Sequence, residues 1–483
     1  MPPIFYYPDY TYQLWQIFSL TREANDNNPL AQHELGIRYL IGDGVPPDTV
    51  KAAYWIKRAA DQNLTAAEYN YGIMLFNGWG TKWDPFAGFK YIQKAAEGFM
   101  PQAEYVYGLL YTDDLIVPRD WKKTYKWVKL AADNDYTPAK KILRELKAKI
   151  PASLLDTTET SKPSAASNNQ NENDNNQNID HNDLASSLGL VYIDFSTVYD
   201  TTNKISDKTL QSDLLLTGND KIKDTVRVKN ELTVKVDSSD IPAIAQAADF
   251  GSPEALAFLA RMYEKGIYYP KNLMTAAEYY LRAMRLNSPR APYFLQQMEK
   301  NNDFINILNE KINQKDPKAM FVLYGLFSFG YTNDIFKQDA IKLLEESANK
   351  NFLPAVDELG LLYNTGEKVK KNVARADELW KRAEKMGDEE ANIRIALSEI
   401  FSNNTNNISS DIDFLRNCEK LGSILAQAGL GYCYENGIGV TKDKSIAVKY
   451  FRSAAQRGNA FAYTELKKMY DEIRPDDPIF QVN

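Results

Sequence analysis

The sequence predicts an all-α fold, an α/α superhelix (solenoid) in which helical hairpins stack side by side. A motif of the form Ala-x-x-x-Leu/Tyr-Gly returns at an interval of 36 residues, opening at Ala31, Ala67 and Ala103. Self-similarity at a fixed period of roughly 20–50 residues is typical of stacked repeat architectures. One short hairpin cannot bury its apolar face alone, so neighbouring hairpins are expected to stack.

The first unit indicates how each hairpin forms. Leu35 and Tyr39 fall on the same helical face as the opening alanine. Gly-Asp-Gly at 42–44 is expected to end this helix, because glycine tolerates the left-handed conformation found past a helix end. Asp48 is placed to cap a second helix, which the pattern predicts from about Thr49 to Ala60. Small residues on both helices should let the two backbones approach closely.

The pattern closely resembles the Sel-1-like repeat, a branch of the tetratricopeptide-like helical repeats. The resemblance is carried by residues 31–60, which read A-x-x-x-L-G-x-x-Y-x-x-G-x-G-V-x-x-D-x-x-K-A-x-x-W-x-x-K/R-A-A. Nearly the same pattern returns at residues 426–455, and degraded copies between the two keep the phase. The resemblance implies a solenoid of paired helices that binds other proteins, often during assembly of secretion, cell-envelope, signalling or host-contact complexes.

The repeats divide the chain into four predicted segments. These are an N-terminal array at 1–150, a disordered Asn-rich linker at 151–183, an acidic insertion at 184–240 and a C-terminal array at 241–483. The units of the second array are expected to open at Ala255, Ala291, Ala319, Ala355, Ala391, Ala426 and Ala462. The unit at Ala291 is short because its glycine loop is deleted. The polar tail Asp476–Asn483 is expected to cap the end of the stack.

The middle of the chain differs from the repeats. Residues 167–178 contain no apolar side chain to bury, so this stretch is expected to be disordered. Residues 225–229 and 232–236 alternate with period 2, which is typical of strands. Three interpretations stay open for 184–240: a linker with weak β propensity, a strand or hairpin that lies along the solenoid or joins a partner's sheet, and a small β domain.

The charge distribution argues against a nucleic-acid-binding protein. The net charge is −7, and residues 151–240 account for it with 8 basic and 15 acidic side chains. The two repeat arrays are nearly neutral, and neither resembles the basic footprint that nucleic acid requires.

The sequence leaves the compartment open. Two cysteines are too few for a disulfide framework. No apolar run is long enough to cross a bilayer, so no transmembrane segment is predicted. Residues 1–4 lack the basic start and apolar core of a signal peptide. The chain is expected to be soluble, in the cytoplasm, or in the periplasm or outside the cell if the numbering begins after a removed signal.

The sequence predicts no catalytic residue, no metal ligand and no cofactor. His33 and His181 lie in different kinds of segment, and His33 is expected on the polar surface of the first repeat. Cys418 and Cys433 lack the spacing of zinc ligands and are expected to be small buried residues of adjacent helices. The Gly-x-Gly loops follow helices and recur with the period, so they are turns rather than phosphate loops.

The concave wall of the solenoid is where binding is predicted. The first helices of successive units should line this wall, exposing the positions just after each opening alanine and just after each following glycine. Tyr, Met and Arg are enriched where proteins meet, so these positions could form a peptide groove. The candidate partner-binding residues are Arg38, Tyr69, Met74, Tyr105, Arg261 and Tyr432. The alternative is that apolar residues at these positions, such as Ile73 and Leu109, pack against the next unit.

These observations predict a non-catalytic scaffold or adaptor that binds protein partners along the concave surface, and self-association is a further possibility. The 30 tyrosines suggest an alternative, a cell-envelope glycan or peptidoglycan-binding protein, although most of them recur at repeat core positions. A hydrolase is disfavoured because only two histidines are present.

Overall fold

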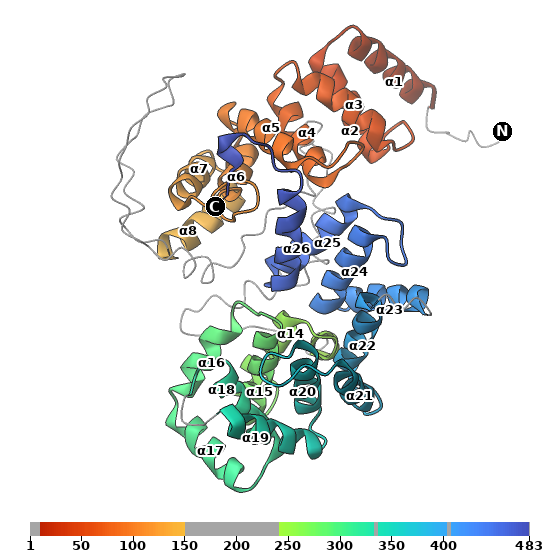
Figure 1. Cartoon of the computed structure of the whole chain (residues 1–483). Helices are drawn as coiled ribbons and strands as arrows, with labels where there is room; N and C mark the ends of the chain where they lie inside the picture. Colours follow the sequence, from red (N-terminus) through yellow and green to blue (C-terminus); the bar gives the residue numbers. More distant parts are fainter. Residues whose placement is uncertain (1–9, 150–240, 333–336, 403–406, 483) are drawn as a thin grey trace, which may run out of the picture. The chain divides into compact units, whose positions relative to one another are not determined.

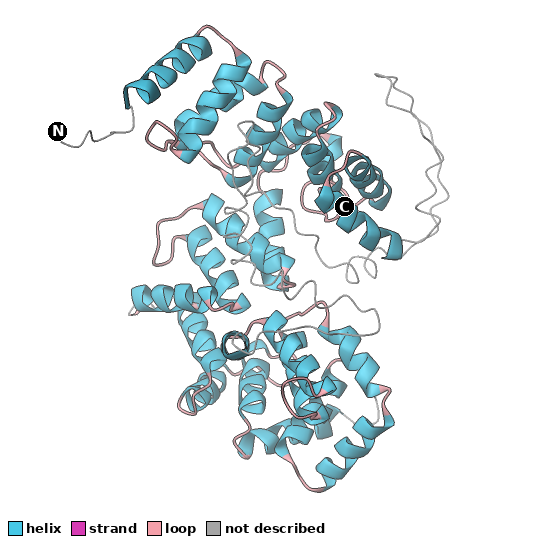
Figure 2. Cartoon of the chain, turned by 180° about the vertical axis from the view of Figure 1, so that it is seen from behind, coloured by secondary structure: helices cyan, strands magenta, loops and turns pink. Residues whose placement is uncertain are grey.

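The predicted repeats fold as helical hairpins. The computed structural model describes residues 10–149, 241–332, 337–402 and 407–482. Within these residues all regular elements are helices (Figures 1 and 2). The all-α solenoid predicted from the 36-residue period is therefore confirmed. The predicted linker at 151–183 and the possible strand or hairpin at 184–240 lie outside the described residues.

The contacts divide the chain into two units, Met1–Leu210 with Leu466–Asn483, and Gln211–Glu465. The helices of the first unit are α1 (Tyr10–Asn25), α2 (Pro29–Ile41), α3 (Thr49–Ala60), α4 (Thr65–Asn77), α5 (Pro85–Glu97), α6 (Pro101–Leu109), α7 (Trp121–Asp133) and α8 (Thr137–Lys149). Those of the second unit are α13 (Ile241–Asp249), α14 (Pro253–Lys265), α15 (Leu273–Arg285), α16 (Ala291–Glu299), α17 (Asn302–Asn313), α18 (Pro317–Ser328), α19 (Lys337–Asn349), α20 (Leu353–Thr365), α21 (Val373–Glu384), α22 (Glu389–Phe401), α23 (Ile408–Lys420), α24 (Ile424–Asn436) and α25 (Lys444–Gln456). The boundary falls inside α26 (Ala460–Asp471), and the short 3-10 helix η2 (Pro478–Phe480) belongs to the first unit.

The capping of the first hairpin follows the sequence closely. The Asn28 side chain accepts hydrogen bonds from the first backbone N–H groups of α2, as an N-cap asparagine does. Gly42 ends α2 in the left-handed conformation, with φ of 78°, and its N–H donates to the carbonyl of Arg38. Asp48 then caps α3. The positions predicted for the turn and the cap are therefore confirmed.

The two helices of a hairpin approach closely at the repeat glycine. A Cβ atom built on Gly36 would lie 2.5 Å from Cγ1 of Ile56 on the partner helix. At the equivalent Gly431, a Cβ would lie 2.7 Å from the ring of Phe451. Any larger residue would push the helices apart, so the small side chains have the role that the sequence predicts.

Two units depart from the regular pattern. The unit at Ala291 is shortened, since the nine-residue α16 is followed by α17 after only two residues. The third unit of the first array lacks the glycine turn, and residues 110–120 replace it with an irregular loop. Leu115, Ile116 and Val117 of this loop are buried, so it packs into the array instead of extending from it.

The end of the chain differs from the prediction. The tail was expected to be a polar cap for the second array, but Phe480 is fully buried and belongs to the first unit. Its ring lies 5.0 Å from that of Phe86 and 5.5 Å from that of Phe89, both on α5. Figure 1 shows the dark-blue stretch after α26 running past α5 and α6. Phe480 is the one aromatic residue of this polar tail, so the composition of the tail did not indicate that a side chain anchors it to the first unit.

The two cysteines lie in one apolar cluster of the second unit. Cys418 on α23 and Cys433 on α24 are both buried and unbridged, as expected of small apolar residues. Burial raises the pKa of each thiol to about 12. The reactive thiolate is therefore scarce at neutral pH.

We expect both thiols of the folded chain to resist iodoacetamide at about pH 8, because a pKa of about 12 leaves roughly one thiolate in ten thousand. Mass spectrometry of the alkylated chain tests this, with the chain in guanidinium chloride as the positive control. Modification of native Cys418 or Cys433 at the rate of free cysteine would contradict the burial described here.

Candidate functional site

The predicted groove of the first array is largely closed. Tyr69 is 4% exposed and Met74 is 0% exposed, so the prediction that these two side chains face a partner is wrong. His33, predicted on the polar surface, is also buried, with its Nε2 atom 2.8 Å from Nδ2 of Asn70. These side chains therefore lie in the interior of this array.

Internal hydrogen bonds explain the burial of the polar residues at these positions. The residue after the opening alanine bonds to the side chain 30 positions later, at the end of the second helix. The three bonds are Gln62 Nε2 to Gln32 Oε1 at 2.7 Å, Asn134 Nδ2 to Glu104 Oε2 at 3.0 Å and Arg457 Nη1 to Gln427 Oε1 at 3.2 Å. These polar residues hold the two helices of a hairpin together and are not free for a ligand.

A second regular contact links successive units. His33 meets Asn70, 37 positions later, and Asp357 meets Arg394 at the same interval, with Arg394 Nε donating at 3.0 Å. Both pairs join the second residue after one opening alanine to the third residue after the next. The contact is made by a histidine and an asparagine in the first array and by an aspartate and an arginine in the second.

Arg38 and Tyr105 remain partly accessible but do not form a common surface with Tyr69 or Met74. Arg38 Nε lies 2.9 Å from Oε1 of Glu34, one turn earlier on α2. The Tyr105 ring packs edge-on against Tyr136, with ring centroids 5.4 Å apart. Both residues stay candidates for partner contact.

Arg261 and Tyr432, the candidates of the second array, lie in separate clusters. Arg261 Nη1 is 2.8 Å from Oε2 of Glu264, and its guanidinium lies 4.4 Å from the ring centre of Phe294. Tyr432 packs against two exposed rings, with centroid distances of 4.7 Å to Phe401 and 6.2 Å to Phe461. The structure thus places neither residue beside the other.

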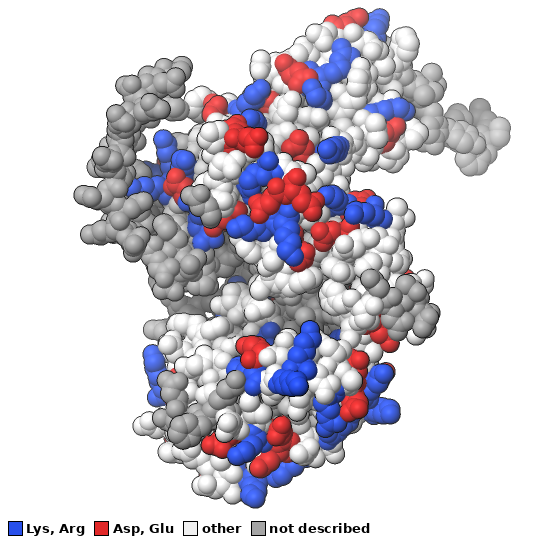
Figure 3. All heavy atoms as spheres, in the orientation of Figure 1, with Lys and Arg blue, Asp and Glu red and all other residues white. Residues whose placement is uncertain are grey.

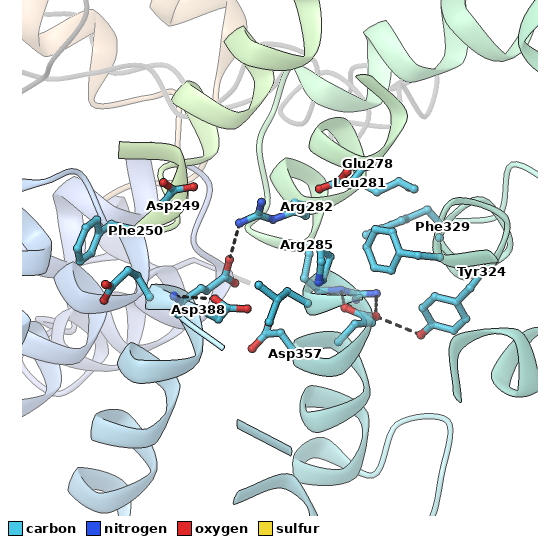
Figure 4. A pocket seen from close by; sticks show the side chains of 18 of the residues that line it. Asp249, Phe250, Glu278, Leu281, Arg282, Arg285, Tyr324, Phe329, Asp357 and Asp388 are labelled. Atoms are coloured by element: carbon cyan, nitrogen blue, oxygen red, sulfur yellow. Dashed lines mark hydrogen bonds and ion pairs between the residues drawn. The ribbon is translucent and has the colours of Figure 1, made fainter. Parts of the chain in front are cut away.

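A pocket of the second unit, called here the acidic pocket, gathers the most charge in one place. Its volume is about 500 Å³, and it is lined from α13, α15, α18, α20 and the start of α22 (Figure 4). Four aromatic residues and seven carboxylates line it beside two arginines. They are Phe250, Phe321, Tyr324 and Phe329; Asp249, Glu278, Asp357, Glu358, Asp388, Glu389 and Glu390; and Arg282 and Arg285.

One side of the acidic pocket is held by a buried ion pair. Arg285 of α15 bonds through two nitrogens to both oxygens of Glu358 on α20, with Nε donating at 2.8 Å. The hydroxyl of Tyr324 donates to the same carboxylate at 3.1 Å, and Arg285 also donates to Ser328 at 3.2 Å. This two-pronged geometry fixes α15, α18 and α20 relative to one another.

The other side of the pocket is held by Arg394. Its Nη2 donates to Glu390 at 2.6 Å, and its Nε bonds to Asp357 on the preceding unit. Arg282 adds a longer contact, with Nη2 at 3.7 Å from Oε2 of Glu390. The arginines are therefore committed to wall carboxylates, and they do not neutralise the whole pocket.

The acidic pocket retains an excess of negative charge. Lys318 pairs with Glu278 at 2.7 Å, so four cations stand against the seven carboxylates. Burial raises the pKa of Asp249, although Arg282 opposes this effect. Burial also raises the pKa of Asp388 and of Asp357, the latter well above its usual value even beside Arg394. A cation entering the pocket would relieve this crowding of carboxylates.

One face of the molecule shows mixed charge. On the face drawn in Figure 3, Lys and Arg side chains are interspersed with Asp and Glu over the described residues. Among the described residues, no group of three or more His, Cys, Asp or Glu side chains is arranged to hold a metal ion. None of the helices in the described ranges is both long and apolar enough to cross a membrane.

Sequence reasoning missed the residues of the acidic pocket. Asp357 and Glu358 stand two and three positions after the opening Ala355, and no other unit places two adjacent carboxylates there. That departure from the repeat was the available signal. The contribution of Asp249, more than 100 residues earlier in the chain, had no local signal.

Replacing Glu358 by Gln is expected to destabilise the second unit by about 3 kcal/mol, because it leaves the Arg285 guanidinium largely buried without its carboxylate. Glu34→Gln is the matched control, since its pair with Arg38 is more exposed and should cost about 1 kcal/mol or less. Urea unfolding followed by circular dichroism compares the two. Equal losses of unfolding free energy would show that the Arg285–Glu358 pair stabilises the fold no more than the Glu34–Arg38 pair does.

The repeated hairpins of this chain are similar to repeats of known proteins. The Sel1 repeat family model matches residues 29–64, 65–98, 101–136, 253–288, 354–388 and 424–459. Protein sel-1 homolog 2 from Homo sapiens is 28% identical over 169 residues, which are 34% of this chain and 23% of that protein. The chain thus matches about a quarter of the length of this relative.

Two solved structures are also similar. One is a protective antigen of uropathogenic Escherichia coli strains displaying an SLR fold, with 19% identity, a TM-score of 0.30 and coverage of 95% of this chain and 91% of that chain. The other is a Sel1 repeat protein from Oxalobacter formigenes, with 17% identity, a TM-score of 0.23 and coverage of 96% and 83%. Six matched segments, each falling on described helical hairpins, show that this chain contains Sel1 repeats.

Proposed function

We propose that this chain is a non-catalytic scaffold that binds a protein partner by accepting an arginine or lysine side chain in the acidic pocket. Sel1 repeat proteins generally mediate protein–protein interactions, and assembly of a larger complex is part of this proposal. The observation that carries it is the pocket itself, in which carboxylates outnumber cations between aromatic walls.

The chemistry of the pocket suits a basic side chain in three ways. Its volume of about 500 Å³ is within the usual range for a binding cavity. Carboxylates form strong charge-assisted hydrogen bonds with guanidinium and ammonium groups. Rings such as Phe250 offer a face for a cation, a contact favoured by arginine.

The ion pairs of the wall hold the pocket in a fixed shape before any ligand binds. Arg285 and Arg394 hold α15, α20 and α22 in place through carboxylates that no partner needs to reach. Asp249 and Glu389 lie on the rim, where Asp249 is exposed and Glu389 is half-buried. These two carboxylates supply the charge that a partner can meet without breaking the wall.

Glycan binding, the alternative function, rested on the many tyrosines. Several of them are buried in the repeat cores and cannot stack on a sugar ring. These are Tyr71, Tyr107, Tyr280, Tyr324 and Tyr470. Glycan binding stays a prediction from composition.

The full chain is expected to bind N-acetyl-arginine amide with a millimolar Kd, and to bind the uncharged N-acetyl-citrulline amide at least about fivefold more weakly. The pocket's carboxylates recognise the charge, which citrulline lacks at nearly the same shape. Isothermal titration calorimetry measures both. The arginine affinity should fall as salt is added, because charge pairs are screened.

A double variant, Asp249→Asn with Glu389→Gln, should lose most of this arginine affinity while staying folded, because neither carboxylate is bound to an arginine of the wall. Glu310→Gln with Glu346→Gln, on α17 and α19, is the matched control for total charge. Cross-linked partners from native cells should be lost with the first variant and kept with the second. Equal affinity of the two variants for the arginine amide would refute the pocket assignment.

Arginine-amide binding is also expected to strengthen as the pH rises through the pKa of Asp249, because the pocket partly desolvates the carboxylate of this exposed residue and raises its pKa above the ordinary value near 3.8. The sign follows from the charge, since binding needs the carboxylate. Folding has the opposite dependence on this group, because a raised folded pKa favours the folded state only while Asp249 is protonated. Titration calorimetry between about pH 4 and pH 7 tests the trend, and a flat profile would contradict it.

A further inference from the structure

The end of the chain packs on a surface of the first array, and the surface that it covers is called here the tail groove. It is formed by α5 and by residues 110–120, the irregular loop of the third unit. The occupant is the segment Arg474–Gln481, which follows α26 and includes η2. Both the groove and its occupant belong to the first unit.

The aromatic end of the segment is its deepest part. Phe480 is fully buried and meets Phe86 and Phe89 edge-on. Lys90 covers the outer side of this ring, with Nζ 5.4 Å from the ring centre. The same Nζ lies 3.0 Å from the carboxylate of Asp477. The tail groove thus binds a phenylalanine ring and the carboxylate of an acidic residue three positions before it.

The other end of the segment is held by an arginine. Arg474 donates from Nη2 to the carbonyl of Leu115 at 2.8 Å and from Nη1 to that of Ile116 at 3.1 Å. Its guanidinium also lies 5.3 Å from the ring centre of Phe86. The irregular loop presents these two carbonyls side by side, and both go to the arginine. This contact depends on the departure of the third unit from the repeat.

The segment also folds onto itself. Nη1 of Arg474 donates to the carbonyl of Phe480 at 2.7 Å, and Nε2 of Gln481 donates to the carbonyl of Pro475 at 2.9 Å. These bonds fix the six-residue spacing between the arginine and the phenylalanine. The recognised unit is therefore a compact short peptide, with most of its anchoring in two side chains.

We propose that the tail groove is a peptide-binding site for short segments with an arginine followed six residues later by a phenylalanine. The chain's own residues 474–481 are its resident ligand, and a peptide of the same chemistry replaces them when it is supplied in trans. This site lies in the first array and is independent of the acidic pocket, so each proposal can fail without the other.

The test uses the full chain with Arg474→Ala and Phe480→Ala, which removes both anchors of the resident segment. The probe is a fluorescein-labelled synthetic peptide with the sequence of residues 472–483, followed by fluorescence anisotropy. We expect this peptide to bind the double variant at least tenfold more tightly than the unaltered chain, whose groove is filled. A control peptide carrying the same two alanines should bind at least tenfold more weakly to the double variant.

A second variant covers the case in which the double variant does not fold. Asp477→Ala alone breaks only the partly exposed ion pair over Phe480, so folding should be kept, and it leaves Lys90 in place for the labelled peptide. It should raise affinity for the labelled peptide less than the double variant does, but measurably above the unaltered chain. Circular dichroism monitors folding in each case. Equal binding of the two peptides to a folded variant, or no binding to either variant, would overturn the proposal.

Discussion

The close approach of two helices at the repeat glycine is the constraint on which the rest of this structure depends. Gly36, Gly72, Gly360 and Gly431 each face a large side chain 20 positions later on the second helix, and an added Cβ would lie 2.5 to 2.9 Å from it. Contact at this distance fixes the depth and rotation of each hairpin. Stacking then needs only an apolar face on either side, because each regular unit presents nearly the same shape to its neighbour.

This constraint explains why the fold could be predicted and the binding surface could not. Glycine and alanine leave a periodic trace in the sequence, and Gly42 and Asp48 mark the turn and the cap by their chemistry. The type of a polar residue does not show whether its side chain points into the array or toward solvent. Glu104 reads as an exposed groove residue by type, but Asn134 holds it inside the hairpin. Only the 30-residue interval between the two would have revealed the bond.

The acidic pocket depends on information that no single repeat contains. It needs Asp249 from α13, Arg285 from α15 and Glu358 from α20, which meet only because the second unit curves through several hairpins. One of its ion pairs does, however, follow the repeat. Asp357 and Arg394 stand where His33 and Asn70 stand in the first array, so the same contact between units joins different side chains in the two arrays.

Phe480 can be buried in the first unit only late in translation, because the ribosome makes the tail long after the residues that the tail covers. Ribosomes complete the groove residues, through Asp120, about 350 residues before they reach Arg474. At roughly 5–20 residues per second, this interval lasts on the order of 20–70 seconds. During translation the rings of Phe86 and Phe89 therefore lack their final cover. Folding factors that recognise exposed aromatic groups have that interval to engage the emerging first array.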